Sequence, residues 1–233
     1  MHNEIENELD NPIASALCGT HRTLARTHGL ALRYPSDVSP LSGLRRQTPA
    51  AFADLRALAA PGESIALFGD GPLDIPADWT LQHADTLNQM IYRLPARPAR
   101  MQPPPLLLQE ADVPDMLALT AATQPGPFLY GTIRMGSYFG IRADDGRLAA
   151  LCGTRLAHDR FTEISAVCTD PAFSGKGHAS ALIMHVAAQI VDAGKLPILH
   201  VRAANPAIRL YEKLGFETRR TLNLTVVTPM QLV

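Results

Sequence analysis

Cysteine is scarce in this sequence, and its spacing excludes two classes of protein. The 233 residues contain three cysteines, Cys18, Cys152 and Cys168, which are far apart and lack the CxxC or Cys/His spacing of a zinc site. A small disulfide scaffold carries many more cysteines for its length. We therefore expect reduced thiols in a cytoplasmic protein, and we expect no metal site.

Long apolar runs and an excess of charge of one sign are also lacking. The sequence starts with MHNEIENELDNP, which is acidic and polar, the opposite of a signal peptide. No run reaches the roughly 20 apolar residues that a membrane helix needs. The formal net charge is −1, so no broad electrostatic field favours nucleic acid or an anionic membrane. We expect neither as a partner.

What the sequence does contain is enough apolar material for a core, divided by one proline-rich segment. Hydrophobic residues make up 46% and charged residues 18% of the chain. The prolines of residues 96–105, ARPARMQPPP, remove N–H donors and favour an extended backbone. We therefore predict an N-terminal α/β region over residues 1–95, a linker over 96–105 and a second domain over 106–233.

The region before the linker has weak signals. Residues 11–28 and 49–60 look helical, and residues 64–68 look like a short buried strand that ends at the turn Gly69–Pro72. Nothing in this region gathers a nucleophile, a base and an orienting group. Its function stays open, and a degenerate copy of the second domain is one interpretation.

The region after the linker has a regular order of elements, which predicts an α/β fold of the α+β kind around a mixed central sheet. A turn at Asp144–Gly146 joins two of its strands, and Gly194 follows its longest helix as a C-cap does. The predicted strands are residues 106–108, 136–142, 147–156, 162–168, 197–201 and 221–227, and the predicted helices lie around Met116 and at residues 177–193 and 206–214.

A glycine loop opens the longest predicted helix. The first N–H groups of a helix lack intrahelical partners, and the helix dipole places partial positive charge there. Gly175, Gly177 and the small Ala179 allow an anion to approach these amides closely. The spacing is neither that of a P-loop nor that of a dinucleotide-binding GxGxxG. From local sequence alone, an anion site and a merely structural loop are equal alternatives.

Two linked blocks make a more specific pattern. The run from Glu163 to Ala179, EISAVCTDPAFSGKGHA, is followed by Asn205 to Phe216, NPAIRLYEKLGF. Together with the order of elements, these blocks resemble the GNAT superfamily of acyltransferases over about residues 106–230. The resemblance implies that acetyl-CoA is the co-substrate and that an N-acetyltransferase binds it beside a mixed central sheet of the GNAT type.

The resemblance also implies roles for individual residues. The strand backbone at Val167, Cys168 and Thr169 would bind the pantetheine arm, and an N–H near Val167 would polarise the thioester carbonyl. Tyr211 would protonate the leaving thiolate, although a packed aromatic residue is the alternative. The loop and the first turn of the helix would hold the pyrophosphate through Ser174, Gly175, Lys176, Gly177, His178, Ala179 and Ser180.

Two positions depart from the family pattern. Ser174 stands where the family has a long arginine or glutamine side chain, so we expect weaker CoA binding, with Lys176 as a partial replacement or a solvated lysine. Ala204 stands where many members have an asparagine, and the neighbouring Asn205 can bind the cofactor in its place only if the loop shifts.

The general base and the acceptor site are less defined. Strand alternation places Glu163 on the same face as Ser165 and Val167, and several members of the family have a catalytic glutamate there. An ordinary strand glutamate and a water relay are the alternatives. We interpret His185 and His200 as structural and Cys168 as a small apolar residue. Weak candidates for the acceptor cleft are Tyr130, Arg134 and Tyr138.

These observations predict an enzyme that transfers an acetyl group from acetyl-CoA to a small-molecule or peptide amine. A non-catalytic acyl-CoA-binding module is the main alternative, because Ser174 and Ala204 depart from the family pattern. A nucleotide-binding interaction protein is a third reading, which the missing P-loop disfavours. The sequence does not select the acceptor, and a homodimer is the default expectation for its assembly.

Overall fold

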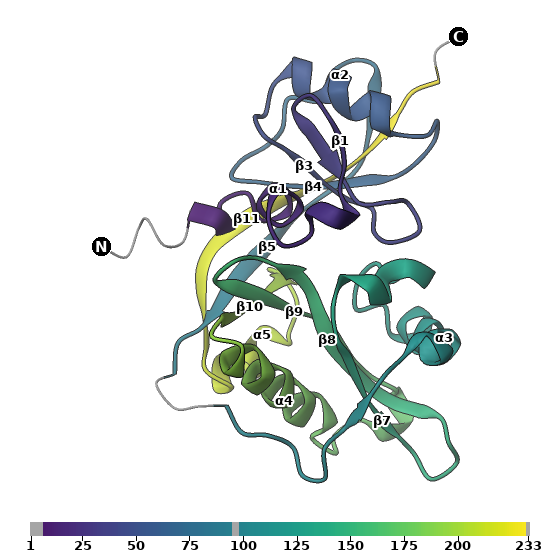
Figure 1. The fold of residues 1–233 in the computed structure, drawn as a ribbon, viewed down its shortest axis with the longest axis vertical. Coiled ribbons are helices and arrows are strands. Elements are labelled where there is room, and N and C mark those ends of the chain that lie inside the picture. The colour runs from purple at the N-terminus through teal and green to yellow at the C-terminus, as the bar shows by residue number, and fades with distance from the viewer. Residues whose placement is uncertain (1–6, 95–97, 232–233) are drawn as a thin grey trace. The chain divides into compact units, whose positions relative to one another are not determined.

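The computed structural model describes residues 7–94 and 98–231, which form two compact units (Figure 1). The first unit contains the chain up to Ser36, Pro40–Asn88 and the residues from Arg220 onward. The second contains Asp37–Ser39 and Gln89–Arg219. These units differ from the predicted ranges 1–95 and 106–233, because two long strands, β5 (Trp79–Tyr92) and β11 (Phe216–Pro229), each contribute to both units.

The predicted linker is only partly described. Residues 95–97 lie outside the described residues, and residues 98–105 contain neither helix nor strand. Among the described residues, no helix is both long and apolar enough to cross a membrane.

The first unit is built on a sheet with the strand order β1-β2-β3-β4-β11-β5. β3 and β4 are parallel, with Leu41 opposite Ala66, and α2 connects them. The Thr48 hydroxyl accepts a hydrogen bond from Ala51 N and so starts α2, with Pro49 in its first turn. The further elements of this unit are η1 (Asn7–Leu9), α1 (Pro12–Cys18), η2 (Arg22–Leu24), β1 (Arg26–His28), β2 (Ala31–Arg33), β3 (Leu41–Leu44), α2 (Pro49–Leu58) and β4 (Ile65–Gly69).

The core of the first unit confirms the predicted helix at 49–60 and strand at 64–68. Phe52 and Leu55 of α2 pack against Ile65 and Leu67 of β4. The ring of Trp79 meets that of Phe52 edge to face, with the ring centres 5.7 Å apart. Burial of this apolar face fixes α2 on the sheet.

The helix predicted over residues 11–28 is wrong beyond its first turns. α1 ends at Cys18, and Arg26–His28 forms β1, which pairs with β2 across a tight turn at Gly29. Gly29 has φ +48°, a conformation that favours glycine. All three residues of β1 are exposed, so its own sequence shows no apolar alternation, and pairing with β2 decides its conformation.

The second unit carries the elements predicted after the linker, on a sheet with the order β6-β7-β8-β9-β10-β5-β11. Its elements are β6 (Leu106–Leu107), η3 (Glu110–Asp112), α3 (Val113–Thr123), η4 (Tyr130–Met135), β7 (Tyr138–Arg142), β8 (Leu148–Ala157), β9 (Phe161–Thr169), η5 (Pro171–Phe173), α4 (His178–Asp192), β10 (Leu196–Arg202) and α5 (Ile208–Lys213). The predicted fold class, a mixed α/β sheet, is confirmed.

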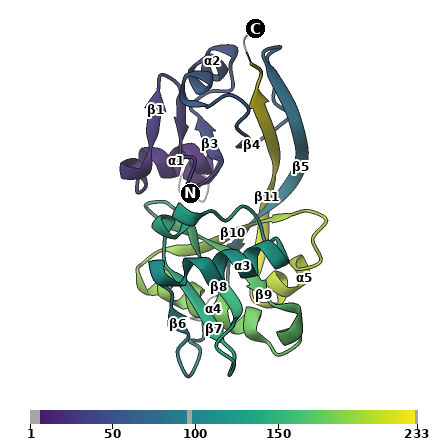
Figure 2. The same cartoon turned by 90° about the vertical axis from the view of Figure 1, so that its right-hand side faces the viewer.

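Two helices cover opposite faces of this second sheet (Figures 1 and 2). Ala150 and Cys152 of β8 pack in the core cluster that contains Leu182, Ile183 and Val186 of α4. Leu151, between them, packs in the cluster that contains Met116 and Leu119 of α3. Since neighbouring residues of a strand face opposite sides, α3 and α4 sandwich β8 and its neighbours.

Candidate acyl-CoA and acceptor site

The central feature of the second unit is an opening between two parallel strands. β9 and β10 pair at Phe161–Leu196, Thr162–Pro197 and Glu163–Ile198. Their pairing stops there, although β9 continues to Thr169 and β10 to Arg202. Backbone N–H and C=O groups along the facing edges are therefore placed to bind an extended ligand instead of a neighbouring strand.

A bulge in β9 lies within this opening. Leu151 of β8 is opposite Cys168, but Gly153 is opposite Ser165, so β9 carries an extra residue between these pairs. Ala166 lies within this bulge and has φ +53°, which is uncommon for a residue other than glycine. Strain of this kind persists where the surroundings enforce it, and it often marks a functional site. Val167, whose neighbourhood was predicted to supply an N–H to the thioester carbonyl, follows directly.

The glycine loop after β9 ends at the N-terminus of α4, as predicted. Gly175 and Gly177 have φ +77° and +79°, and a Cβ on either would meet no atom within 4 Å. Both glycines are therefore required by their backbone conformation and not by tight packing. The first intrahelical bond runs from Ala181 N to Gly177 O. The N–H groups of His178, Ala179 and Ser180 consequently have no partner within the helix and suit an anion.

Two cationic side chains lie beside the Phe173 ring, next to this loop. The Lys176 ammonium lies 5.1 Å from the centre of the Phe173 ring, and the Arg147 guanidinium lies 5.4 Å from it. Arg147 comes from the β7–β8 hairpin, and sequence reasoning missed it because it is distant along the chain. Its carboxylate partners, Asp145 at 2.8 Å and Asp170 at 3.7 Å, offset part of its charge.

The other predicted cofactor residues differ in accessibility. Val167 and Thr169 are half-buried and Cys168 is buried. The Thr169 hydroxyl is buried and, within the described residues, has no hydrogen-bond partner, which fits a polar ligand in the opening. Asn205 is exposed, and its Oδ1 accepts a hydrogen bond from Ala207 N just before α5. A capping role for Asn205 is therefore visible, whereas a cofactor contact stays a prediction.

Tyr211, the predicted acid, lies on α5 in the same core as α4. Its side chain is buried, with the ring centre 6.3 Å from that of Phe216. Burial raises the pKa of Tyr211 to about 12. The hydroxyl therefore keeps its proton at neutral pH, as a proton donor requires.

Glu163, the predicted base, lies in a buried ion-pair network. Arg155 Nε donates to Glu163 Oε2 at 3.0 Å and Arg155 Nη2 donates to Oε1 at 2.6 Å. His200 Nδ1 lies 2.9 Å from Oε1, and Leu156 N donates to Oε2 at 3.3 Å. Burial alone would raise the pKa of Glu163, but the charge of Arg155 and the hydrogen bonds from Arg155 and His200 hold that pKa well below its usual range. A carboxylate held in this way is a weak base.

The network continues beyond His200 and so fixes its tautomer. Gln89 Oε1 accepts a hydrogen bond from Arg219 Nη1 at 2.9 Å, which directs the Gln89 NH2 group toward His200 Nε2, 3.0 Å away. His200 Nε2 is then the acceptor, and Nδ1 carries the proton that points to Glu163. His200 is therefore structural, as the sequence predicted.

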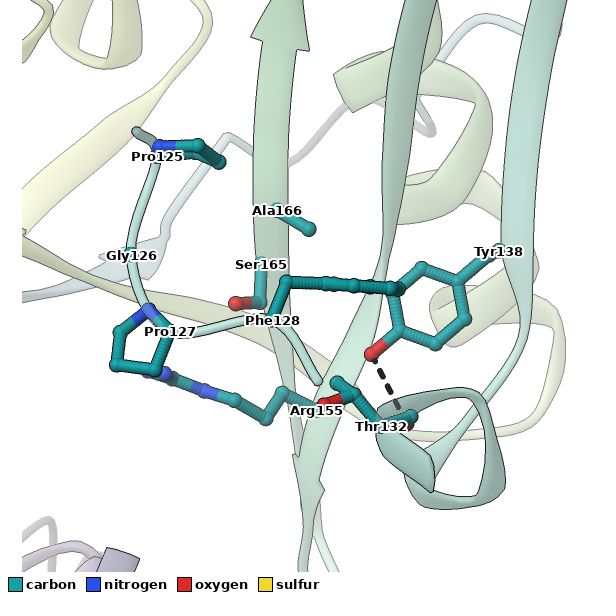
Figure 3. A pocket seen from close by; sticks show the side chains of 9 residues that line it. All are labelled: Pro125, Gly126, Pro127, Phe128, Thr132, Tyr138, Arg155, Ser165 and Ala166. Atoms are coloured by element: carbon teal, nitrogen blue, oxygen red, sulfur yellow. Dashed lines mark hydrogen bonds between the residues drawn. The ribbon is translucent and has the colours of Figure 1, made fainter. Parts of the chain in front are cut away.

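A small pocket, with room for about one water molecule, lies beside the bulge (Figure 3). Its lining consists of Pro125, Gly126, Pro127, Phe128, Thr132, Tyr138, Arg155, Ser165 and Ala166. Of the three acceptor-cleft candidates, Tyr138 lines this pocket, whereas Tyr130 is 66% exposed and Arg134 pairs with Asp37. Sequence reasoning missed Arg155, because only tertiary structure brings it to the pocket and to Glu163. Among the described residues, no group of three His, Cys, Asp or Glu side chains is placed to hold a metal ion.

Comparison with solved structures first defines the class of fold. A GCN5-related N-acetyltransferase from Kribbella flavida superposes with a TM-score of 0.63 at 16% identity, over 94% of this chain and 95% of that one. Another from Sphaerobacter thermophilus gives a TM-score of 0.50 at 13% identity, over 88% and 79%. At such identities the likeness concerns the fold, which is that of the GCN5-related N-acetyltransferases.

Closer similarity then assigns the family. The model of the family described as "FR47-like protein" matches residues 138–224. A structure from Novosphingobium aromaticivorans, assigned to the GNAT family of acetyltransferases, is 36% identical over 97% of this chain and 100% of its own, with a TM-score of 0.89. This chain belongs to the GNAT family, and the predicted resemblance is confirmed. Among curated proteins, none matches the chain.

Proposed function

We propose that the protein is an N-acetyltransferase that moves an acetyl group from acetyl-CoA to a primary amine by direct attack in a ternary complex. The observation that carries this proposal is the end of β9–β10 pairing at Glu163–Ile198, directly before a glycine loop and the N-terminus of α4. Family membership and fold support acyl transfer in general. The amine acceptor and the roles of single residues belong to the proposal.

The residues present fit acetyl-CoA at this opening. Backbone groups of Val167, Cys168 and Thr169 lie on the unpaired edge of β9, where the pantetheine amides would bind, and the Thr169 hydroxyl adds a polar group. The amides of the loop and of the first turn of α4 would hold the pyrophosphate. Lys176, with Arg147 from the neighbouring hairpin, adds positive charge at the loop.

Proton transfer uses two different groups in this proposal. Tyr211, which keeps its proton at neutral pH, delivers it to the thiolate as the bond from the carbonyl carbon to sulfur breaks. The N–H beside the bulge at Ala166 stabilises the oxyanion that forms on the carbonyl. The acceptor ammonium loses its proton to water before the free amine attacks the thioester, because Glu163 is held ionised as a weak base by Arg155 and His200.

Calorimetry with acetyl-CoA tests the cofactor site. Ala179→Glu places a carboxylate in the first turn of α4, where it repels a pyrophosphate but suits the helix dipole, so the fold is retained. Ala179→Gln is the matched control without charge. We expect the Glu variant to bind acetyl-CoA at least tenfold more weakly than the Gln variant. Equal affinities would place the cofactor elsewhere.

Thiol release then separates catalysis from mere binding. An amine-dependent release of CoA by the wild type supports the enzyme. Binding of acetyl-CoA without thiol release over a broad panel of amines would favour an acyl-CoA-binding module instead.

A further inference from the structure

The second unit contains three residues from a much earlier part of the chain. Asp37–Ser39 lie between β2 and β3 but belong to this unit, and the Val38 side chain is fully buried. Gly131 N, in η4, donates to Asp37 O at 2.8 Å. Thr132 Oγ1 donates to Val38 O at 2.7 Å, across 94 positions of the sequence. Two hydrogen bonds to backbone carbonyls therefore hold η4 on this early segment.

The contact at Gly131 is close enough to require glycine. A Cβ at this position would lie 2.8 Å from Asp37 O and 2.9 Å from Asp37 Oδ2, closer than a real Cβ approaches another atom. Gly131 has no positive φ, so the contact and not the backbone conformation explains the glycine. The ion pair between Arg134 and Asp37 lies in the same place, but both side chains are exposed, and such pairs contribute little. The backbone contacts therefore dominate the attachment of η4.

The same turn of η4 reaches the reacting centre of the proposed site. Thr132 lines the small pocket together with Ser165 and Ala166, which lie at the bulge of β9. Its carbonyl oxygen accepts a hydrogen bond from the Tyr138 hydroxyl at 3.4 Å (Figure 3). A displacement of η4 from Asp37–Ser39 would consequently move the groups beside the bulge, where the amine attacks in the proposed reaction.

We propose that Asp37 and Val38 are positioning residues for the acceptor. Their backbone carbonyls hold η4 beside the bulge, so amine binding depends on them and acetyl-CoA binding does not. The inference rests on the proposed acetyl transfer. The proposed contacts of acetyl-CoA come from β9, the glycine loop and α4, and the two hydrogen bonds to η4 involve none of these elements. Part of the N-terminal region thereby acts in the reaction.

An added methyl group at Gly131 tests this attachment directly. Gly131→Ala forces the Asp37 carbonyl away, whereas the control Gly71→Ala adds a methyl group that meets no atom within 4 Å. The probe is the amine of the thiol-release panel that the wild type acetylates fastest. We expect Gly131→Ala to lower kcat/KM for this amine about tenfold or more, through KM, because small misplacements of positioning groups have effects of this size. Acetyl-CoA affinity by calorimetry should match that of wild type and Gly71→Ala.

A substitution on the early segment tests the other side of the contact. Val38→Ala loosens this segment without changing any residue that lines the small pocket. Val227→Ala is the matched control, because Val227 is as fully buried and lies in the core of the first unit. We expect a higher KM for the amine in Val38→Ala only. An unchanged KM in both Gly131→Ala and Val38→Ala, or an equal increase in Val227→Ala, would overturn the inference.

Hydrogen exchange gives a readout that needs no turnover. The Gly131 amide should exchange faster in Val38→Ala than in wild type and Val227→Ala, while the amides of α4 keep the wild-type rate. Equal exchange at Gly131 in all three proteins would contradict the attachment. A wild type that neither binds acetyl-CoA nor releases thiol would instead contradict the acetyltransferase itself, whereas normal wild-type turnover with unaltered variants would contradict only the role of Asp37 and Val38.

Discussion

In the proposed site Tyr211 is protonated and Glu163 is ionised, and the local contacts of each residue explain its protonation state. Tyr211 is buried in an apolar core, which raises its pKa to about 12 and keeps the hydroxyl protonated. Glu163 is equally buried, but Arg155 and His200 lower its pKa and keep it ionised. Burial alone favours the neutral form of both groups, so the charge of Arg155 and the hydrogen bonds to Glu163 decide the difference.

Removal of the Tyr211 hydroxyl should reduce catalysis more than binding. In Tyr211→Phe we expect kcat to fall about 100-fold, the lower range for loss of a general acid, with unchanged affinity for acetyl-CoA. Tyr92→Phe is the matched control, because its buried ring also contacts Phe216, with ring centres 5.5 Å apart. Similar loss in both variants would indicate that Tyr211 only packs.

Substitution of Glu163 separates a positioning role from a basic one. Glu163→Gln leaves Arg155 without its counter-charge, so we expect a loss of about 3 kcal/mol in the free energy of unfolding at pH 7. The pH profile of kcat should keep the wild-type shape. A selective loss of kcat at low pH that recovers as the amine deprotonates would show instead that Glu163 is the base.

The same residue predicts a dependence of stability on pH. Because the folded-state pKa of Glu163 lies below its unfolded value of about 4.5, its contribution is present above that value and is lost as pH falls below it. The difference in unfolding free energy between wild type and Glu163→Gln should therefore shrink between pH 5 and pH 3. Denaturant unfolding across this range measures it, and a constant difference would contradict the assigned pKa direction.

At the scale of elements, α4 combines a polar start with an interior that contains a buried histidine. His185 is 3% exposed, its ring meets Phe139 edge to face, and its Nδ1 has no hydrogen-bond partner among the described residues. Burial, together with the nearby charge of Arg100, lowers the pKa of His185. The neutral ring therefore behaves as part of the apolar face of α4.

This position makes the packing of α4 sensitive to acid. The folded protein binds a proton at His185 less readily than the unfolded chain does, so stability falls as pH drops below about 6.5, the unfolded value. We expect the unfolding free energy of the wild type to decrease between pH 7 and pH 5.5. His185→Leu should show a smaller decrease over the same range, and an equal decrease would assign the effect to other groups.

For the whole molecule, the two units depend on strands from distant parts of the chain. The sheet of the first unit includes residues 220–229 of β11, with Leu224 opposite Phe68 and Val226 opposite Ala66. The sheet of the second unit includes residues 89–92 of β5. Each unit also contains a parallel pair joined by a helix, β3-α2-β4 and β9-α4-β10, which supports the proposal that the N-terminal region is a degenerate copy of the same fold.

A cut at the predicted linker should therefore inactivate both parts. A fragment of residues 98–233 lacks β5, and a fragment of residues 1–97 lacks β11, so each exposes strand edges that its sheet normally pairs. We expect each fragment alone to be poorly folded by circular dichroism, and co-expression to restore acetyl-CoA binding. A soluble 98–233 fragment that binds acetyl-CoA alone would contradict this dependence.

The sequence by itself determined the features that depend on local backbone chemistry. The glycines at 175 and 177, the start of α4, the turn at Gly146 and the alternation of β7 to β9 follow from residues close together in the chain, and they sufficed for the family. β5 was missed because its first half is mostly exposed, and β1 was taken for helix because it has no apolar pattern of its own.

Only the tertiary structure decided which side chains from different strands share one environment. It placed Arg155 of β8 and His200 of β10 on Glu163 of β9, and it brought Arg155 to the pocket beside the bulge. The alternation of the sequence placed Glu163 on the correct strand, but it left open whether Glu163 is the general base or an ordinary strand residue. The groups that set the pKa of Glu163 belong to residues whose proximity depends on strand register, which no local pattern specifies.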